Sequence, residues 1–99
     1  FTGGDYQEAA AITGGANADV TVATTALAND AGIITAIQTS TDATPTLFIV
    51  GNTADGEVQA WYDADPDADG GEIQVGTFAG IGIGDIAASF ITGDFTFVA

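Results

Sequence analysis

Three segments in the second half of the chain have the hydrophobic patterns of β-strands. Residues Thr46–Val50 form a continuous apolar run between Pro45 and Gly51, the pattern of a strand that is buried on both faces. Residues Glu57–Tyr62 and Glu72–Phe78 instead alternate between apolar and polar side chains, the pattern of strands with one buried face. Because turn-forming connections separate these segments, we expect three consecutive antiparallel strands.

Alternation within the second and third segments assigns their side chains to faces. We expect one face of each strand to present the following residues: Val58, Ala60 and Tyr62 in the second segment, and Ile73, Val75 and Thr77 in the third. Trp61 and Tyr62 then lie on opposite faces of one strand. We favour one core residue with a half-exposed neighbour, and the alternative is an aromatic platform for sugars or an interface anchor.

The patterns are weaker before this region. Residues Tyr6–Thr13 and Asp19–Ala26 are candidate strands, and the Gly-, Ala- and Thr-rich stretch 1–30 that contains them has the composition of an arm that pairs with a neighbouring subunit. Ala9–Ala11 can equally belong to a short helix. Residues Ile33–Thr39 are rich in β-branched side chains, which favours a further strand.

The C-terminal part predicts a short helix and a last strand. Asp85 can cap a helical turn over Ile86–Phe90. Residues Asp94–Ala99 alternate, with Phe95 and Phe97 on one face of a closing strand. Together the patterns predict an all-β fold, a single domain over residues 1–99, arranged as an antiparallel β-sandwich or a small stack of sheets.

The charge composition constrains the chemistry of this domain. The chain holds 14 acids and no Lys, Arg or His, which gives a net charge of −14. No ion pair between side chains can form, so each carboxylate must be solvated, accept hydrogen bonds from backbone N–H groups or bind an external cation. Nucleic acids, phosphates and anionic membranes are bound through Lys and Arg, so we expect none of them as partners.

The missing residue types narrow the possible cofactors and the setting. Without Cys or His, the chain has no ligands for zinc, haem or iron–sulfur clusters, and only oxygen-seeking ions such as Ca²⁺ remain. No apolar run reaches about 18 residues, so we expect no membrane insertion. The absence of Cys agrees with a bacterial extracellular protein. Because the chain has no Met, we expect a processed form or a fragment, with Phe1 as a cleavage end.

An acidic run separates the second and third predicted strands. Its acids alternate with other residues before Gly70, which matches the first half of an EF-hand calcium loop. The EF-hand is incomplete, because its twelfth position is Gly76 and the flanking segments have strand patterns. A calcium loop within a hairpin remains, and its predicted ligands are Asp63, Asp65, Asp67, Asp69 and Glu72.

The alternative to a calcium loop is a solvated turn, and the repulsion between the carboxylates helps to decide between them. Carboxylates ~6.8 Å apart along an extended chain repel by about 0.6 kcal/mol per pair in water, which an exposed turn tolerates. At about 4 Å and an effective dielectric of about 20, each pair costs about 4 kcal/mol. Pro66 and Gly70–Gly71 favour a curled loop, so we favour calcium. Weaker candidates for a second ion are Asn52, Asp55 and Glu57, although an ordinary Asp-Gly turn is the favoured interpretation there.

Residues 46–99 resemble the C-terminal regions of RTX-type bacterial proteins that are exported by type I secretion. The resemblance rests on the order of strands, Asp-rich loop and Gly-rich turn, and on Asp94–Val98, an acid followed by hydrophobic residues near the end of the chain. The glycine-rich nonapeptide of that family is absent, since Gly84 stands where its Asp would be. The resemblance implies an extracellular or cell-surface location, folding on calcium after export, and roles in surface layers, adhesins or matrix.

Two functional hypotheses follow. The first is a structural, self-assembling extracellular protein, a filament, surface-layer or matrix subunit, that forms a homo-oligomer or polymer stabilised by calcium. The second is a calcium-dependent module that binds carbohydrate or a receptor and is cut from a larger exported protein. We expect no enzyme, because no Ser–His, Cys–His or Lys arrangement exists in the chain and the clustered acids have the spacing of metal ligands.

Overall fold

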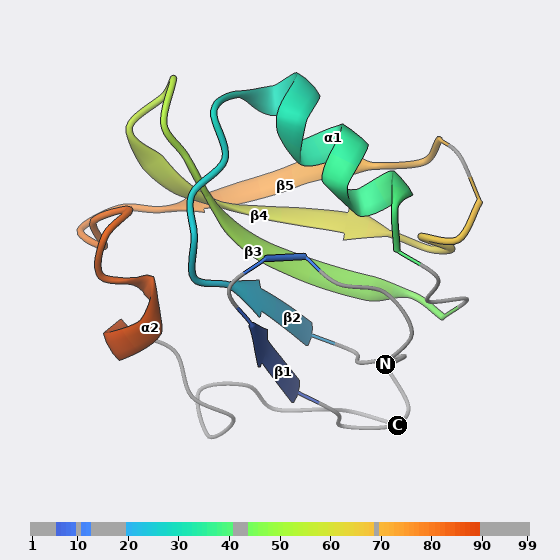
Figure 1. The fold of residues 1–99 in the computed structure, drawn as a ribbon, viewed down its shortest axis with the longest axis horizontal. Helices are drawn as coiled ribbons and strands as arrows, with labels where there is room; N and C mark the ends of the chain where they lie inside the picture. The colour runs from blue at the N-terminus through green and yellow to red at the C-terminus, as the bar shows by residue number, and fades with distance from the viewer. Residues whose placement is uncertain (1–5, 10, 13–19, 41–43, 69, 90–99) are drawn as a thin grey trace.

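The described part of the computed structural model, residues 6–9, 11–12, 20–40, 44–68 and 70–89, forms a five-stranded sheet with helices on both sides (Figure 1). The strands stand in the order β1-β2-β3-β4-β5 across the sheet. In chain order the elements are β1 (Tyr6–Ala9), β2 (Val20–Ala23), α1 (Asp30–Gln38), β3 (Thr46–Asn52), β4 (Glu57–Asp63), β5 (Ile73–Phe78) and α2 (Ile86–Ser89).

The sheet is mixed, and the fold is mainly β. Strands β3, β4 and β5 form an antiparallel meander, as the sequence patterns predict. The prediction of an antiparallel arrangement throughout is wrong for the first two strands, because β1, β2 and β3 run parallel. Parallel neighbours require a crossover connection, and α1 lies in the crossover between β2 and β3. The described strands all belong to this one sheet, whereas a sandwich requires a second.

Helix α1 corrects the prediction of a strand over Ile33–Thr39. Asn29 caps the helix, because its side-chain oxygen accepts a hydrogen bond from the Gly32 backbone N–H at 2.9 Å. Ile33 and Ile37 are four residues apart and fully buried, so they form the single apolar stripe that a helix needs. The β-branched composition favours a strand, but capping and burial of this stripe outweigh that preference.

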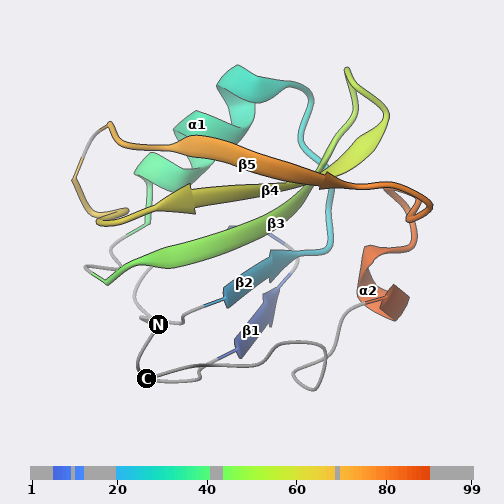
Figure 2. The same cartoon turned by 180° about the vertical axis from the view of Figure 1, so that it is seen from behind.

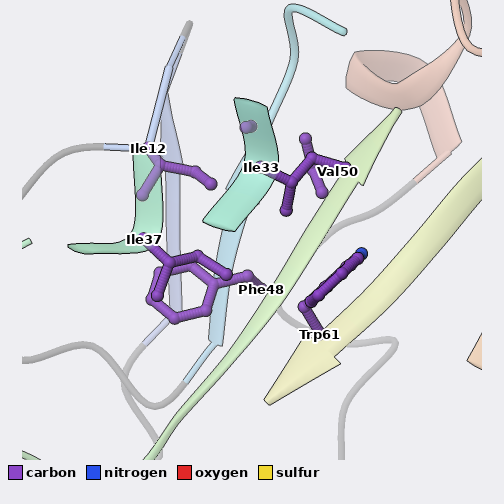
Figure 3. Close-up of a cluster of buried hydrophobic side chains, with 7 residues drawn as sticks. Ile12, Ile33, Ile37, Phe48, Val50 and Trp61 are labelled. Atoms are coloured by element: carbon purple, nitrogen blue, oxygen red, sulfur yellow. The ribbon is translucent and has the colours of Figure 1, made fainter. Parts of the chain in front are cut away.

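One face of the sheet packs against α1. Figure 3 shows Ile33 and Ile37 of the helix beside Phe48 and Val50 of β3, with Trp61 of β4 on the same side. Ile12 and Ala23 complete this buried cluster. Strand β3 also buries Ile49 on the opposite face, so the prediction that Thr46–Val50 is covered on both sides is confirmed.

The opposite face of the sheet is covered by the segment that follows β5. Its buried cluster consists of Val20, Val22, Ile49, Val58 and Ile86, and the partly buried Leu47, Phe78, Ile81 and Ile83 pack against it. The connection approaches β3 closely, because a Cβ atom added to Gly51 would lie 3.2 Å from the Ile83 Cβ atom. The predicted helical turn over Ile86–Phe90 is α2, which spans Ile86–Ser89, and Phe90 lies outside the described residues.

A register shift between β4 and β5 changes the predicted faces of the last strand. Ile73 lies opposite Tyr62, whereas Thr77 lies opposite Gln59. Directly paired residues share a face, and positions 59 and 62 of one strand project from opposite faces. The prediction that Ile73, Val75 and Thr77 line one face is therefore wrong, because a bulge reverses the alternation between the first and last of them.

The remaining predictions concern the ends of the chain. Strands β1 and β2 lie within the predicted Tyr6–Thr13 and Asp19–Ala26 but are shorter, and both join this chain's own sheet. The predicted strand Asp94–Ala99 lies outside the described residues. Neither helix among the described residues has the length and apolar character needed to cross a bilayer.

Candidate functional site

Gln59 is the centre of a buried network of polar side chains on the α1 face of the sheet. Its Oε1 atom accepts hydrogen bonds from the Trp61 indole N–H at 3.0 Å and from Asn52 Nδ2 at 3.2 Å. Its Nε2 atom donates to Asp55 Oδ2 at 2.9 Å and to Glu57 Oε1 at 3.0 Å. Because the indole nitrogen can only donate, the Gln59 atom facing it must be the oxygen, and the NH₂ group must face the two carboxylates.

Asn52 extends this network to the first turn of α1. Its Nδ2 atom donates to Asp30 Oδ1 at 2.6 Å, and its Oδ1 atom accepts from the Asp55 backbone N–H at 3.3 Å. Asn52 and Gln59 are both fully buried, so their hydrogen bonds replace contacts with water. Two side-chain amides thereby hold three carboxylates in a chain that has no Lys, Arg or His.

The network contains all three residues predicted as weaker calcium ligands. Asn52, Asp55 and Glu57 all hydrogen-bond to the Gln59 side chain, so they converge around an amide. The amide hydrogens of Gln59 lie between the two carboxylates, where they provide the positive charge density that a cation would otherwise supply. Sequence analysis does not single out Gln59 or Asp30, although the alternation of β4 places Gln59 on the same face as Trp61, which was a usable signal.

The acidic loop between β4 and β5 begins at Asp63 and ends at Glu72. Asp63 is the last residue of β4 and is only 2% exposed. Its Oδ1 atom accepts a hydrogen bond from the Asp65 backbone N–H at 2.9 Å, whereas its Oδ2 atom is buried and has no hydrogen-bond partner among the described residues. The same holds for the Oε1 atom of Glu72, just before β5.

The environment of Asp63 disfavours its negative charge. Burial raises the pKa of the Asp63 carboxyl above its ordinary value of 3.8. The hydrogen bond from Asp65 N–H acts in the opposite direction, and repulsion from the Glu72 and Asp65 carboxylates raises the pKa further. Asp63 and Glu72 stand next to the paired Tyr62 and Ile73 at one end of the β4–β5 ladder, so the two ends of the loop form an acidic pair.

The middle of the loop is arranged differently from its ends. The side chains of Asp65 and Asp67 are exposed, and Asp69 lies outside the described residues. Gly70 and Gly71 have positive φ angles of 91° and 88°, a conformation that allows the chain to turn back toward Asp63. The described residues contain no group of three or more acids placed to hold one metal ion, so the pair at the loop ends is the part of the predicted ligand set that is brought together.

Trp61 and Tyr62 separate as the favoured interpretation expects. Trp61 is 4% exposed and packs in the cluster beneath α1, and Tyr62 is half-buried on the other face. Since the Trp61 ring is enclosed by the core and its N–H is bonded to Gln59, it offers no open face on which a sugar ring could stack.

Strand β5 forms an edge of the sheet (Figure 2). Among the described residues its hydrogen-bonding neighbour is β4, so the outward row of backbone groups has no strand beside it. Its sequence contains no charged residue, and it presents the two exposed large hydrophobic side chains of the described residues, Ile73 at 57% and Val75 at 56%. An uncharged, apolar edge strand is a template for pairing with another strand.

Comparisons with known proteins leave the family open. No family model matches the chain, and neither curated proteins nor solved structures yield a match. The resemblance to RTX-type proteins thus stays a prediction, and functional arguments rest on the geometry of the loop, the network and the sheet edge.

Proposed function

We propose that this chain is a structural, self-assembling extracellular protein, a subunit of a filament, surface layer or matrix, that is stabilised by calcium. The observation that supports assembly is the edge strand β5, which has no strand on its outer side among the described residues and exposes Ile73 and Val75. Adding a strand of a second subunit would satisfy the outward backbone groups and bury both apolar side chains.

Charge favours β5 over other surfaces as the contact between copies. Each copy has a net charge of −14, so two copies repel wherever acidic surfaces face each other. Strand β5 has no acid between Glu72 and Phe78, which makes it a surface at which two such chains can approach with little repulsion. Natural edge strands are commonly protected by charged residues or Pro, and β5 has neither.

The symmetry of this contact determines what it can build. Pairing of β5 with β5 of a second copy is isologous and closes into a dimer. Growth into a filament or layer then needs a second contact between dimers, and calcium ions that neutralise or bridge the remaining carboxylates would lower the repulsion opposing it. An extracellular location agrees with this requirement and with the absence of Cys.

The test compares two substitutions that change the charge equally at different places. Val75→Glu puts a carboxylate on the edge strand, whereas Thr35→Glu puts one at an exposed position of α1, the helix that packs on β3. Sedimentation velocity and negative-stain electron microscopy, in calcium and in chelator, should show oligomers or polymers of the wild type and of Thr35→Glu in calcium. Val75→Glu should remain monomeric under the same conditions.

The result that contradicts the proposal is equally plain. If the wild-type protein sediments as a monomer across the concentration range in calcium, the chain does not self-assemble. If Val75→Glu and Thr35→Glu assemble to the same extent as the wild type, β5 is not the contact. Monomers in calcium that bind glycans would instead favour the calcium-dependent binding module.

A further inference from the structure

We propose that the Asp63–Glu72 pair provides the side-chain ligands of a single calcium ion, and that the alternating acids in the middle of the loop do not. This inference rests on the calcium dependence of the proposed function and is independent of the assembly. It narrows the predicted ligand set from five acids to the two that stand where the loop leaves β4 and enters β5.

The first argument concerns two buried carboxylate oxygen atoms that accept no hydrogen bond from the described residues. Asp63 Oδ2 and Glu72 Oε1 are both inaccessible to solvent, and neither has a hydrogen-bond partner in the part of the chain that the structure describes. A buried carboxylate oxygen without a partner is costly, and native proteins rarely leave one in that state. No Lys, Arg or His exists in the chain, so a positive charge that pairs with these oxygens must come from outside the chain.

The second argument compares the pair with the other acids of the chain. The carboxylates of Asp55 and Glu57 accept hydrogen bonds from Gln59 and are therefore already stabilised. The exposed side chains of Asp65 and Asp67 are stabilised by water. Asp63 differs, because it is almost completely buried beside another acid and uses only one of its two oxygens.

The third argument concerns the remaining ligands. Calcium takes six to eight oxygen atoms, including backbone carbonyls and waters, in a flexible geometry. The turn at Gly70–Gly71 brings the chain back to Asp63, because a Cβ atom added to Gly71 would lie 3.4 Å from Asp63 Oδ1. Backbone carbonyls of this turn and water molecules are the further ligands that the proposal requires. Two carboxylates are a small charge for a calcium site, so we expect a Kd of about 10⁻⁴–10⁻³ M, the range of extracellular modules.

A calcium ion at this position would have a consequence for the sheet edge. Asp63 and Glu72 stand next to Tyr62 and Ile73, which pair with each other in the β4–β5 ladder, so the ion would add a link just beyond the last pair of that ladder. Ordering the start of β5 would prepare the edge strand for pairing with a second subunit. Calcium would then promote assembly through the shape of the edge as well as through screening of charge.

The test is calorimetric titration of calcium into four proteins, each placed in the monomeric Val75→Glu background: the parent, Asp63→Asn, Glu72→Gln and the double control Asp65→Asn/Asp67→Asn. Removal of even an outer-shell partner of a metal weakens binding by about 10–100-fold, so each single variant should lose at least about tenfold. The double control removes two exposed charges and should stay within about fivefold of the parent.

Thermal unfolding of the same proteins adds a readout that a merely structural role would not give. In chelator, Asp63→Asn and Glu72→Gln relieve the repulsion within the pair, so both should melt at higher temperature than the parent, which also shows that they fold. In excess calcium, the order should reverse, because only the parent and the double control gain stability from the ion.

Three results would overturn the inference. They are the absence of calcium heat in the parent, unchanged affinity in Asp63→Asn, and loss of binding in the double control. The first of these together with wild-type assembly would refute the calcium site and leave the assembly intact. Calcium binding by a wild-type protein that never assembles would refute the assembly and leave the site intact.

Discussion

Replacing Gln59 by Glu tests whether a side-chain amide takes the place of a cation in this protein. Gln59→Glu keeps the size and shape of the side chain, so it creates no cavity. It removes the Nε2 donor that holds Asp55 Oδ2 at 2.9 Å and Glu57 Oε1 at 3.0 Å and puts a third carboxylate oxygen there. The bonds from Trp61 and Asn52 to Oε1 can persist, so the change acts on the contact between amide and carboxylates.

The magnitude follows from these two contacts. A hydrogen bond to a charged group contributes about 1.5–3 kcal/mol, so losing both costs about 3–6 kcal/mol. Repulsion adds to this cost, and it is moderated because Asp55 is exposed and Glu57 is half-buried. A loss of at least about 4 kcal/mol is a large part of the 5–15 kcal/mol that stabilises a typical domain and lowers Tm by about 16 °C or more.

The assay is chemical and thermal unfolding of dilute protein at pH 7 and at about pH 4.5. The deficit of Gln59→Glu should shrink at the lower pH, because the introduced carboxyl group, buried beside two acids, binds a proton more tightly in the folded than in the unfolded chain and can then donate an O–H. The control is Gln74→Glu on the exposed β5, which should change the free energy of unfolding by less than about 0.5 kcal/mol. A Gln59→Glu variant within 1 kcal/mol of the wild type at pH 7, on the order of one neutral hydrogen bond, would refute the role given to this amide.

Two further predictions concern the helix cap and the acidic pair. Asn29→Ala should destabilise the protein by about 1 kcal/mol and lower Tm by about 4–8 °C, while Asn29→Ser should retain most of the stability; equal melting of both variants would contradict the cap. In chelator, the raised pKa of Asp63 means that the folded state binds its proton more tightly than the unfolded chain, so the Asp63 contribution to stability is present at low pH and is lost as the pH rises from 3.8 through the folded pKa. The stability of the wild type relative to Asp63→Asn should therefore fall over that pH window in urea titrations, and a difference that is constant with pH would contradict the shift.

Hydrophobic pattern alone identifies the strands whose partners are their neighbours in sequence. The apolar run of β3 and the alternation of β4 predict a hairpin, and their register from Thr46 opposite Asp63 to Asn52 opposite Glu57 is continuous. Such contacts are local, so the sequence near each strand contains most of the information. The register shift at β5 is invisible to the same reasoning, because alternation cannot report where one extra residue is accommodated.

The helix was missed because composition and periodicity point in different directions over Ile33–Thr39. Five of these seven residues are β-branched, which favours a strand. The deciding signals are Asn29 before the segment and the four-residue spacing of Ile33 and Ile37, which are weak until the stripe has a surface to cover. That surface is formed by Phe48 and Val50 of β3. Strand β3 pairs in parallel with β2, and such a long-range contact cannot be predicted from local sequence patterns.

For the functional groups, too, local features can be predicted from the sequence, whereas features that depend on long-range contacts cannot. The acidic run is evident from sequence. Its alternate spacing suggests Asp65 and Asp67 as metal ligands, but these two side chains are exposed, whereas Asp63 at the end of the run is buried. Burial of position 63 follows from the register of β4 opposite Thr46, which determines how far the strand extends into the loop. The bond between Asn52 and Asp30 joins residues 22 positions apart, so it depends on α1 crossing the sheet and has no signature in either segment.

A chain without cationic side chains has a limited number of ways to stabilise its carboxylates, and this protein uses them unequally. Side-chain amides serve one cluster, in which Gln59 uses both donors and both acceptor positions and the network is complete. The Asp65 backbone N–H donates to Asp63 Oδ1, but among the described residues Asp63 Oδ2 and Glu72 Oε1 have no hydrogen-bond partner. The amides of the network stabilise their carboxylates without an ion, whereas the calcium ion proposed above would supply the partner that the acidic pair lacks. Calcium should therefore act at the start of β5, the same place at which the uncharged edge of the sheet begins, and this proximity is why the ion and the assembly are expected to be coupled.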